Sequence, residues 1–365
     1  MFCAPVLRWD LTMTCNLRCR HCSRSGDIGH GHASHPLSQD TLSIVKKINP
    51  EVCSNLHLLG GEPLTHPDIL TILGELIDAC ICTTVYTNGL LINDDFINTV
   101  RNSHRFEVVV SIDGPDSDSH ERIRGKSTFN AAITNITKLV NDFQNTQLRV
   151  GISSTLYADT IYRIHDLIDL ASKLNVDALY LNKLIEYGNA AIRSEEIGIN
   201  ADTYLNAVAE YFNKHGLSVK KGGQPLVFYG FLDTPLRAYL KKCIGIDIAI
   251  PYVPCRAATT EGAIDSAGRL WPCTVFYGNR ELRQPLADYF GISNNSLISR
   301  SVEDIWESDG FKNFREVKAK NLHKRFGNPC YKCRYADLCT PCFLPYLIKG
   351  SFDRPDCLRL LHVLL

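Results

Sequence analysis

The chain has 365 residues, with 39 basic and 39 acidic side chains and therefore no formal net charge. This length allows a large core and about two domains, whereas the balanced charge leaves no basic surplus for binding nucleic acid. No apolar run reaches the length of a membrane span, and the N-terminal residues MFCAPVLRWDL lack a signal-peptide pattern. We therefore expect a cytoplasmic protein that binds neither nucleic acid nor a membrane.

Strand-like and helix-like segments alternate through the first 185 residues. The predicted strands are 5–13, 55–59, 83–86, 105–112, 148–155 and 178–181, and the predicted helices between them are 39–48, 67–79, 94–101, 128–143 and 162–174. The helices follow from apolar residues spaced three and four apart. Strict alternation predicts parallel strands joined by helices, either in an open doubly wound sheet or in a partial barrel. In both folds, functional groups lie at the C-terminal ends of the strands.

The remaining sequence divides into two further regions. We expect residues 1–185 to form the α/β domain and residues 186–242 to form a helical bridge that contains a helix at 201–215. From residue 243 onward the sequence becomes rich in glycine, proline and cysteine. Residues 243–365 are therefore predicted to form a small cysteine-rich domain, with a short helix at 358–365.

Fifteen cysteines are distributed unevenly along the chain. An odd number and the lack of an export signal argue against a disulfide framework. Three cysteines lie between residues 15 and 22, eight lie from Cys243 onward, and none lies between Cys82 and Cys243. This distribution indicates metal binding at both ends of the chain.

The N-terminal group consists of Cys15, Cys19 and Cys22, with the spacing C-x3-C-x2-C. Three thiolates of this kind can hold three irons of a cubane cluster and leave the fourth iron open for chemistry. Zinc needs a fourth ligand, for which His21 or His30 is available, but this spacing is unusual for a zinc site. The spacing therefore favours an iron–sulfur cluster.

The C-x3-C-x2-C motif, with His21 before its last cysteine, resembles that of the radical S-adenosylmethionine (SAM) superfamily. The resemblance implies that the open iron chelates SAM and that one electron cleaves SAM into methionine and a 5′-deoxyadenosyl radical. The radical then abstracts a hydrogen atom from the substrate, while the protein supplies orientation and excludes water. It also implies a TIM-like partial (β/α)6 barrel, which we prefer to the doubly wound sheet, and an electron donor of the flavodoxin or ferredoxin type.

Two motifs stand at strand ends where this family places SAM contacts. Gly60-Gly61-Glu62-Pro63 follows the second predicted strand. Adjacent glycines allow close backbone approach and Glu62 can accept a hydrogen bond from an ammonium group, and the family uses this motif to hold the SAM amino group. Thr87-Asn88-Gly89 closes the third strand. Asn-Gly is a common turn pair, and in the family this tripeptide lines the SAM pocket.

Further candidate SAM contacts follow from the same resemblance. Ser111 and Asp113 close the fourth strand, where the family places contacts to the ribose or carboxylate of SAM. Arg124 is either a partner of the SAM carboxylate or a solvated loop arginine. Ser153 on the fifth strand and Asn182 at the end of the sixth are candidates by position, the latter near the expected adenine.

The C-terminal cysteines form an array that ends with C-x2-C-x5-C-x2-C at residues 330–342 and one later cysteine. The array resembles the SPASM domain, which carries auxiliary clusters in radical SAM enzymes. The family has three residues between its last two clustered cysteines, where this chain has only Thr340 and Pro341. A pair of zinc ribbons is the alternative on the residues alone.

Eight thiolates suffice for two fully ligated auxiliary 4Fe–4S clusters. By the interleaved pattern of the SPASM family, the first cluster takes Cys243, Cys255, Cys273 and Cys342. By the same pattern, the second takes Cys330, Cys333, Cys339 and Cys357.

Auxiliary clusters imply net oxidation, because they can accept the electron that remains after hydrogen abstraction and deprotonation. The layout resembles that of anaerobic sulfatase maturases, but Thr274 stands where those enzymes carry an acidic base after the cysteine of G-x4-C. Formylglycine formation is therefore disfavoured. Asp265 and Tyr277 are nearby candidates for other roles.

The expected substrate is a peptide or protein side chain, as in ribosomal peptide maturation, because this is the commoner use of the two domains. The alternative is a small molecule such as a sugar, an aminoglycoside or a porphyrin. Only 14 residues precede Cys15, which leaves no room there for a leader-binding domain. An exposed edge strand would support a peptide, and a closed polar pocket a small molecule. A rival of another class is a non-catalytic zinc-ribbon binding protein.

Overall fold

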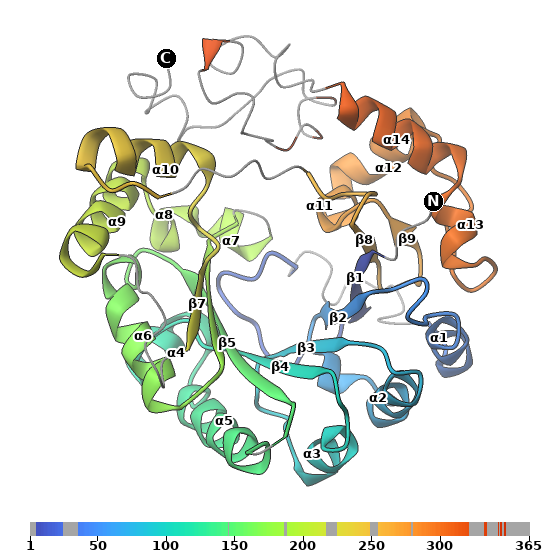
Figure 1. The fold of residues 1–365 in the computed structure, drawn as a ribbon, viewed down its shortest axis with the longest axis horizontal. Helices are drawn as coiled ribbons and strands as arrows, with labels where there is room; N and C mark the ends of the chain where they lie inside the picture. The colour runs from blue at the N-terminus through green and yellow to red at the C-terminus, as the bar shows by residue number, and fades with distance from the viewer. Residues whose placement is uncertain are drawn as a thin grey trace.

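The computed structural model describes residues 5–24, 36–144, 146–185, 188–216, 225–248, 255–278 and 280–320, together with residues 332, 333, 342, 344 and 347. Within these residues, one nine-stranded sheet curves into an open barrel with helices on its outer side (Figure 1). The architecture is the partial barrel expected from the sequence, and the open doubly wound sheet was the wrong alternative.

The strands follow the chain around the barrel in a simple order. They are β1 (Val6–Thr12), β2 (Asn55–Gly60), β3 (Thr83–Thr87), β4 (Phe106–Ser111), β5 (Arg149–Leu156), β6 (Ala178–Lys183), β7 (Leu226–Tyr229), β8 (Glu261–Ile264) and β9 (Leu270–Trp271). Their order in the sheet is β7-β6-β5-β4-β3-β2-β1-β8-β9. All neighbouring strands are parallel except β8 and β9, so the C-terminal ends of β1–β6 meet at one rim.

Helices connect successive strands, as parallel pairing requires. The crossover helices are α1 (Ser38–Val45), α2 (Ile69–Asp78), α3 (Asp94–Val100), α5 (Phe129–Asp142) and α6 (Ile164–Lys173). The other helices are η1 (Pro63–Thr65), α4 (Ser117–Arg124), η2 (Ile161–Arg163), α7 (Asn189–Ile192), α8 (Ser194–Ile197), α9 (Ala201–His215), α10 (Thr234–Tyr239), η3 (Leu240–Ile244), α11 (Thr274–Gly278), α12 (Arg280–Phe290), α13 (Val302–Trp306) and α14 (Asp309–Ala319).

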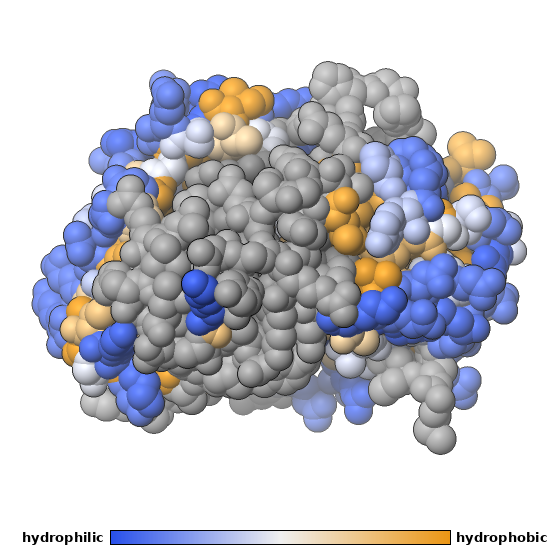
Figure 2. All heavy atoms as spheres, turned by 90° about the horizontal axis from the view of Figure 1, so that it is seen from above, coloured by the Kyte–Doolittle hydropathy of each residue, from blue (hydrophilic) through white to orange (hydrophobic). Residues whose placement is uncertain are grey.

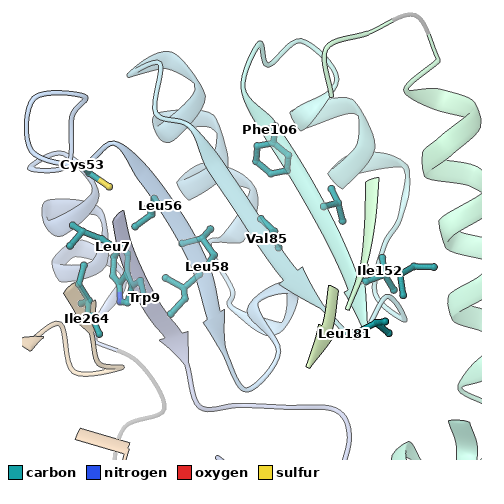
Figure 3. Close-up of a cluster of buried hydrophobic side chains, with 14 of the residues drawn as sticks. Leu7, Trp9, Cys53, Leu56, Leu58, Val85, Phe106, Ile152, Leu181 and Ile264 are labelled. Atoms are coloured by element: carbon teal, nitrogen blue, oxygen red, sulfur yellow. The ribbon is translucent and has the colours of Figure 1, made fainter. Parts of the chain in front are cut away.

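The main hydrophobic core lies between the outer face of the sheet and these helices. Leu7 and Trp9 on β1, Leu58 on β2 and Val85 on β3 belong to one buried cluster (Figure 3). Ile44 of α1 is buried in the same cluster. Because successive side chains of a strand point to opposite faces, the residues between these apolar positions face the inside of the barrel.

The inner face of the barrel is polar. It carries Arg8 and Asp10 on β1, His57 on β2, Glu107 on β4 and Tyr180 on β6, and all except Asp10 are partly exposed. A closed eight-stranded barrel fills its interior with branched apolar side chains. The polar lining here indicates a surface suited to a ligand.

The six predicted strands and the predicted helices after them are confirmed, with ends that differ by a few residues. The sequence missed β7, which adds a strand from the segment predicted as a helical bridge, and it did not predict that a short strand of the C-terminal region, β8, pairs with β1. It also predicted no helix at residues 117–124, where the structure has α4. The domain boundaries stay a prediction, and the helix predicted at 358–365 lies outside the described residues.

The outer surface of the described residues is largely hydrophilic on the face shown in Figure 2, with small apolar groups between the polar ones. Among the described helices, none has both the length and the apolar character needed to cross a membrane.

Candidate active site

The cysteine loop, residues 13–24, leaves the C-terminal end of β1. Cys19 is buried, while Cys15 and Cys22 are partly exposed, and all three are free thiols. The backbone N–H of Cys22 donates to the carbonyl of Cys19 (3.3 Å), and the N–H of Leu17 donates to Cys15 Sγ (3.4 Å). A short turn therefore brings the three predicted cluster ligands together at the rim of the barrel.

Gly60, the last residue of β2, and Gly61 bring that strand into direct backbone contact with the cysteine loop. The N–H of Gly61 donates to the Thr12 carbonyl (2.7 Å), and the N–H of Glu62 donates to the Thr14 carbonyl (2.8 Å). A Cβ on Gly60 would lie 2.3 Å from the Thr12 carbonyl oxygen, and one on Gly61 would lie 2.3 Å from the Thr14 oxygen. Gly60 also has φ of +120°. Glycine is therefore required at both positions to support the loop.

Glu62 is buried and joins the GGEP motif to the Thr87-Asn88 segment. Its Oε1 accepts from Thr87 Oγ1 (2.7 Å) and from the N–H of Leu64 (3.1 Å), and its Oε2 accepts from the N–H of Asn88 (2.7 Å). Burial raises the pKa of Glu62, and these hydrogen bonds oppose the rise. Asn88 Nδ2 also donates to Asn16 in the cysteine loop (2.7 Å). The two motifs predicted from sequence thus form one connected unit.

A second connected unit forms around Asp113, just after β4. Its Oδ2 accepts from Arg124 Nε (2.5 Å) and lies 3.1 Å from His21 Nε2, and its Oδ1 accepts from the N–H of Thr155 (2.8 Å). Burial alone would raise the pKa of Asp113, but the charge of Arg124 and the contact with His21 outweigh it and hold the pKa well below its usual range. This buried carboxylate therefore fixes the cysteine loop, through His21, to β4 and β5.

Arg124 is not the solvated loop arginine of the sequence-based alternative. It ends α4, its side chain is 12% exposed, and its Nε is bound to Asp113. Its positive charge also lies close enough to Cys19 and Cys22 to interact with both thiols. Burial raises the pKa of Cys19 to about 11, and the guanidinium opposes this rise, which favours the thiolate form that metal binding requires.

Ser111, Ser153 and Asn182 lie side by side on β4, β5 and β6, where Ser111 and Asn182 are near the C-terminal ends of their strands and Ser153 is within β5. Ser111 and Ser153 are register partners, and Asn182 Nδ2 donates to Ser153 Oγ (3.1 Å). All three are partly exposed. The structure therefore groups these candidates at the rim where the cysteine loop lies, and their contact with SAM stays a prediction.

Asn189, at the start of α7, is a site residue that the sequence analysis missed. Its backbone N–H donates to the Cys22 carbonyl (3.0 Å), and its Nδ2 donates to the Cys19 carbonyl (2.9 Å). It stands in no recognisable motif, and its partners are about 170 positions earlier in the chain. Local sequence patterns contain no signal for such a contact.

A buried polar bridge joins β1, the cysteine loop and α11. Tyr277 donates from its hydroxyl to Asp10 Oδ2 (2.9 Å), and Arg24 Nη2 lies 2.8 Å from the same oxygen. Arg24 also donates to the Tyr277 hydroxyl (3.1 Å) and lies over its ring. Burial and the neighbouring Asp10 raise the pKa of Tyr277 well above its usual value. Of the two side chains near Cys273 that the sequence singled out, Tyr277 therefore contacts the cysteine loop.

Asp265, the other of those two, has a structural role. Its carboxylate accepts from the N–H groups of Ala267 and Arg269, from Arg269 Nε and from Trp271 Nε1, all within 3.0 Å. These bonds close the turn between β8 and β9.

Three of the predicted ligands of the first auxiliary cluster lie near one another. The pKa of Cys273 is raised to about 12, first by burial and then by the proximity of Cys342 and Cys255. Lys318 of α14 donates to the Cys255 carbonyl (3.0 Å) and interacts electrostatically with Cys255 and Cys273. This grouping fits the predicted set, whose fourth member, Cys243, is exposed.

For the second auxiliary cluster, Cys333 is the described member, and Cys330, Cys339 and Cys357 lie outside the described residues. Within the described part of the chain, no three Cys, His or acidic side chains lie close enough to hold a single metal ion. The ligand sets therefore rest on the resemblance to the SPASM family and stay a prediction. Free thiols on one short loop, with a guanidinium beside them, fit an iron–sulfur cluster at Cys15, Cys19 and Cys22.

Two family models match the chain. The radical SAM superfamily model matches residues 9–171, and the model of the SPASM iron–sulfur cluster-binding domain matches residues 255–334. Together these domains imply iron–sulfur clusters and SAM binding. The non-catalytic zinc-ribbon hypothesis, which predicted no SAM binding, is not supported by these matches.

Similar proteins include both small-molecule and peptide enzymes. The AdoMet-dependent heme synthase of Methanosarcina barkeri is 25% identical over 97% of this chain and 96% of its own length. The mycofactocin maturase MftC of Mycobacterium ulcerans is 23% identical over 97% of this chain and 87% of its own length. The crystal structure of Streptococcus suis SuiB bound to the precursor peptide SuiA covers 97% of this chain and 76% of that chain, with 18% identity and a TM-score of 0.70.

Proposed function

Because the chain belongs to the radical SAM superfamily and carries a C-terminal SPASM domain, we propose that it cleaves SAM and carries out a net oxidative modification of a peptide or protein side chain. The observation that carries the proposal is the cysteine loop, where three free thiols are held by three strand ends and an arginine at the rim of the barrel.

In this proposal Cys15, Cys19 and Cys22 hold the cluster that binds SAM. When bound, the cluster supplies the open iron and the electron for reductive cleavage of SAM, with a flavodoxin- or ferredoxin-type donor as the source. The protein residues position the cluster and SAM. Glu62 and the Thr87-Asn88 segment hold the GGEP backbone against the loop, and the Asp113–Arg124 pair fixes the loop from the opposite side.

The remaining rim residues are proposed to orient SAM. Ser111, Ser153 and Asn182 offer hydroxyl and amide groups in adjacent positions on three neighbouring strands. Hydroxyl and amide groups suit a ribose and an adenine, because each can donate and accept hydrogen bonds. The eight C-terminal cysteines are proposed to hold two auxiliary 4Fe–4S clusters, which suit net oxidation.

One structural feature favours a peptide substrate. Strand β7 pairs with β6 on one side, and no described strand pairs with its other side. Leu226 and Phe228 on this strand are each 40% exposed. An extended peptide can add to such an edge by main-chain hydrogen bonds. Similarity to a mycofactocin maturase and to a peptide-bound enzyme structure supports the same substrate class.

The second candidate function is oxidation of a small molecule, in particular decarboxylation or dehydrogenation of a porphyrin. Similarity to heme synthases favours it, since the Methanosarcina enzyme aligns over nearly the full length of both chains. The polar inner face of the barrel is compatible with this function as well.

The first experiment measures iron, acid-labile sulfide and zinc in protein purified without oxygen, and then 5′-deoxyadenosine formation from SAM with a chemical reductant. We expect about twelve irons and twelve sulfides per chain, as three 4Fe–4S clusters require. Replacing Cys15, Cys19 and Cys22 together with alanine is expected to remove about four irons and to abolish SAM cleavage. Zinc without sulfide, or SAM cleavage that survives the triple replacement, would contradict the proposal.

A further inference from the structure

We propose that Arg8, His57 and Tyr86 form a binding site for a carboxylate on the inner face of the barrel, and that this site holds the substrate. The second half of the proposal rests on the proposed function. The three residues, called the donor cluster below, lie on neighbouring strands β1, β2 and β3.

Strand register places the donor cluster on one surface. Arg8 is the register partner of His57, and His57 is the partner of Thr84, two residues before Tyr86 on the same face of β3. The rings of His57 and Tyr86 are 5.6 Å apart. On β1, Asp10 and then Thr12 follow Arg8 on the inner face and lead to the cysteine loop. The donor cluster therefore lies below the rim at which SAM is proposed to bind.

The side chains of the donor cluster have N–H and O–H groups that donate to no other described residue. Among the described residues, none of its three side chains makes a hydrogen bond, and the buried His57 Nδ1 has no partner. Arg8 has one charged neighbour, Glu261, at 3.6 Å from its Nε. Buried polar groups are nearly always paired in native proteins, so the unpaired His57 Nδ1, beside the partly exposed side chains of Arg8 and Tyr86, indicates a place for a ligand.

The neighbouring carboxylates are already bound by other residues. Glu261 lies 3.0 Å from Arg256 Nη1, and Glu107 accepts from the Tyr180 hydroxyl (2.9 Å). Glu261 is thus shared between Arg8 and Arg256, so it neutralises the charge of Arg8 only in part. The Arg8 side chain is 34% exposed, so an incoming group can reach it.

The local potential favours an anion. Burial is the main cause that lowers the pKa of His57 to about 4, and the positive charges of Arg8 and Arg256 lower it further, so these two arginines supply a positive potential at His57. Burial raises the pKa of Tyr86, the charge of Arg8 lowers it, and the charges of Glu107 and Glu261 raise it again, so these two carboxylates oppose a highly charged anion. A single carboxylate, which a guanidinium can bind with two parallel hydrogen bonds, satisfies both conditions better than a phosphate does.

Carboxylates occur in both substrate classes of the proposed function. In a peptide the group is an acidic side chain or the C-terminus, and in a porphyrin it is a propionate. The shared chemistry is the carboxylate, and the experiment distinguishes its source.

The test measures equilibrium binding to the full-length, cluster-loaded protein without reductant. One pair of probes is coproporphyrin III and its tetramethyl ester, followed by porphyrin fluorescence. The other pair is acetyl-Glu-glycinamide and acetyl-Gln-glycinamide. Their binding is followed by the NMR signals of 15N-labelled histidine, and the same titrations are made with the Arg8→Met and His57→Gln variants. We expect the wild-type protein to bind the acid at least about tenfold more tightly than the neutral form in one pair, since a bidentate charged contact is worth more than 1.4 kcal/mol. That pair identifies the source.

In Arg8→Met the affinities for the acid and the neutral probe are expected to become about equal. Arg8→Lys is expected to retain part of the preference for the acid, because lysine keeps the positive charge but lacks the two parallel N–H donors of the guanidinium. Arg101→Met is the control, since Arg101 directly follows the outer helix α3 and pairs with Asp142. Tyr86→Phe keeps the ring but loses the hydroxyl, and it is expected to weaken binding of the acid without weakening binding of the neutral probe. This variant replaces Arg8→Met in the test if Arg8→Met does not fold.

Equal binding of acid and neutral probes by the wild-type protein, or a preference that persists in Arg8→Met, would overturn the inference. The assay needs no SAM cleavage. A wild-type protein that prefers the acid but produces no 5′-deoxyadenosine would contradict the proposed function and still support the carboxylate site. An enzyme that cleaves SAM but binds acid and neutral probes equally would contradict the carboxylate site and leave the proposed function intact.

Discussion

Tyr277 donates its hydroxyl proton to Asp10 Oδ2 over 2.9 Å, although the two residues are 267 positions apart. Tyr277 belongs to the segment that begins directly after Cys273, and Arg24, which also binds Asp10, follows Cys22 by two residues. The bridge therefore connects a proposed auxiliary-cluster ligand with a proposed ligand of the SAM-binding cluster. It is one of the contacts that fix the position of α11 relative to the cysteine loop.

Tyr277→Phe is expected to destabilise the protein by about 1.5–3 kcal/mol, because a buried hydrogen bond to a charged acceptor is lost. Urea unfolding under anaerobic conditions measures the change. Tyr157→Phe is the matched control, since Tyr157 is equally buried but donates to a neutral carbonyl, that of Ser119 (2.5 Å). We expect about 1 kcal/mol there. A smaller loss for Tyr277→Phe than for Tyr157→Phe would mean that the bridge contributes little.

Gly61→Ala is expected to prevent correct placement of the cysteine loop. The added Cβ would lie 2.3 Å from the Thr14 carbonyl oxygen and 2.8 Å from its carbon, both of them backbone atoms. We expect a loss of more than about 2 kcal/mol and fewer bound irons, because overpacking against backbone forces the two strands apart. Thermal unfolding and iron analysis measure the two effects.

Gly74→Ala is the control for this substitution. Gly74 lies in α2, and an added Cβ would meet no atom within 4 Å. Alanine there is expected to stabilise the protein by about 0.5–1 kcal/mol, since glycine is a poor residue for a helix interior. If both alanines have the same effect, the close contact between β2 and the loop is not the reason for the GGEP glycines.

Arg124→Met is expected to cost about 3–5 kcal/mol, because it leaves the buried Asp113 carboxylate without its main partner. Arg122→Met is the control on the same helix. Arg122 is exposed and pairs with Asp159, and such surface pairs contribute about 0–1 kcal/mol. Urea unfolding at pH 7 compares the two variants. A loss of less than 1 kcal/mol for Arg124→Met would show that His21 and the Thr155 amide suffice for Asp113.

The sequence predicted the elements that depend on local patterns. The crossover helices have apolar residues at helical spacing, and the cluster motif needs only the order of its cysteines. Helix α4 was missed because Ile123 is its only large apolar residue, so it has no apolar periodicity, although Asp116 caps it through the N–H of Ser119. Strand β7 was missed because its four residues are too few for a clear alternation.

Contacts between segments that are distant in the sequence could not be predicted from local sequence patterns. The sequence proposed that Arg124 pairs with the carboxylate of SAM or with water, but it gave no means of finding Asp113 as its partner. It also gave no indication of Asn189. These contacts depend on the closure of the barrel, which places the ends of β4 and β6 near the loop after β1.

His57 provides a prediction of pH dependence. Its pKa is lowered to about 4 in the folded protein by burial and by Arg8 and Arg256, whereas an unfolded histidine has a pKa of about 6.5. The unfolded chain therefore binds a proton more readily, and stability falls as the pH is lowered from about 6.5 to about 4. The maximum contribution is about 3 kcal/mol, since each unit of pKa corresponds to 1.36 kcal/mol.

His57→Gln is expected to reduce the loss of stability between pH 6.5 and 4 while changing stability at pH 7.5 much less, because glutamine does not titrate. Urea unfolding without substrate, across this pH range, measures the difference. His120, whose pKa is also lowered to about 4 by burial and Arg124, accounts for part of the remaining slope. If the pH profiles of the variant and the wild-type protein are parallel, burial and the two arginines do not hold His57 neutral in the folded protein, and the positive potential proposed for the donor cluster loses this support.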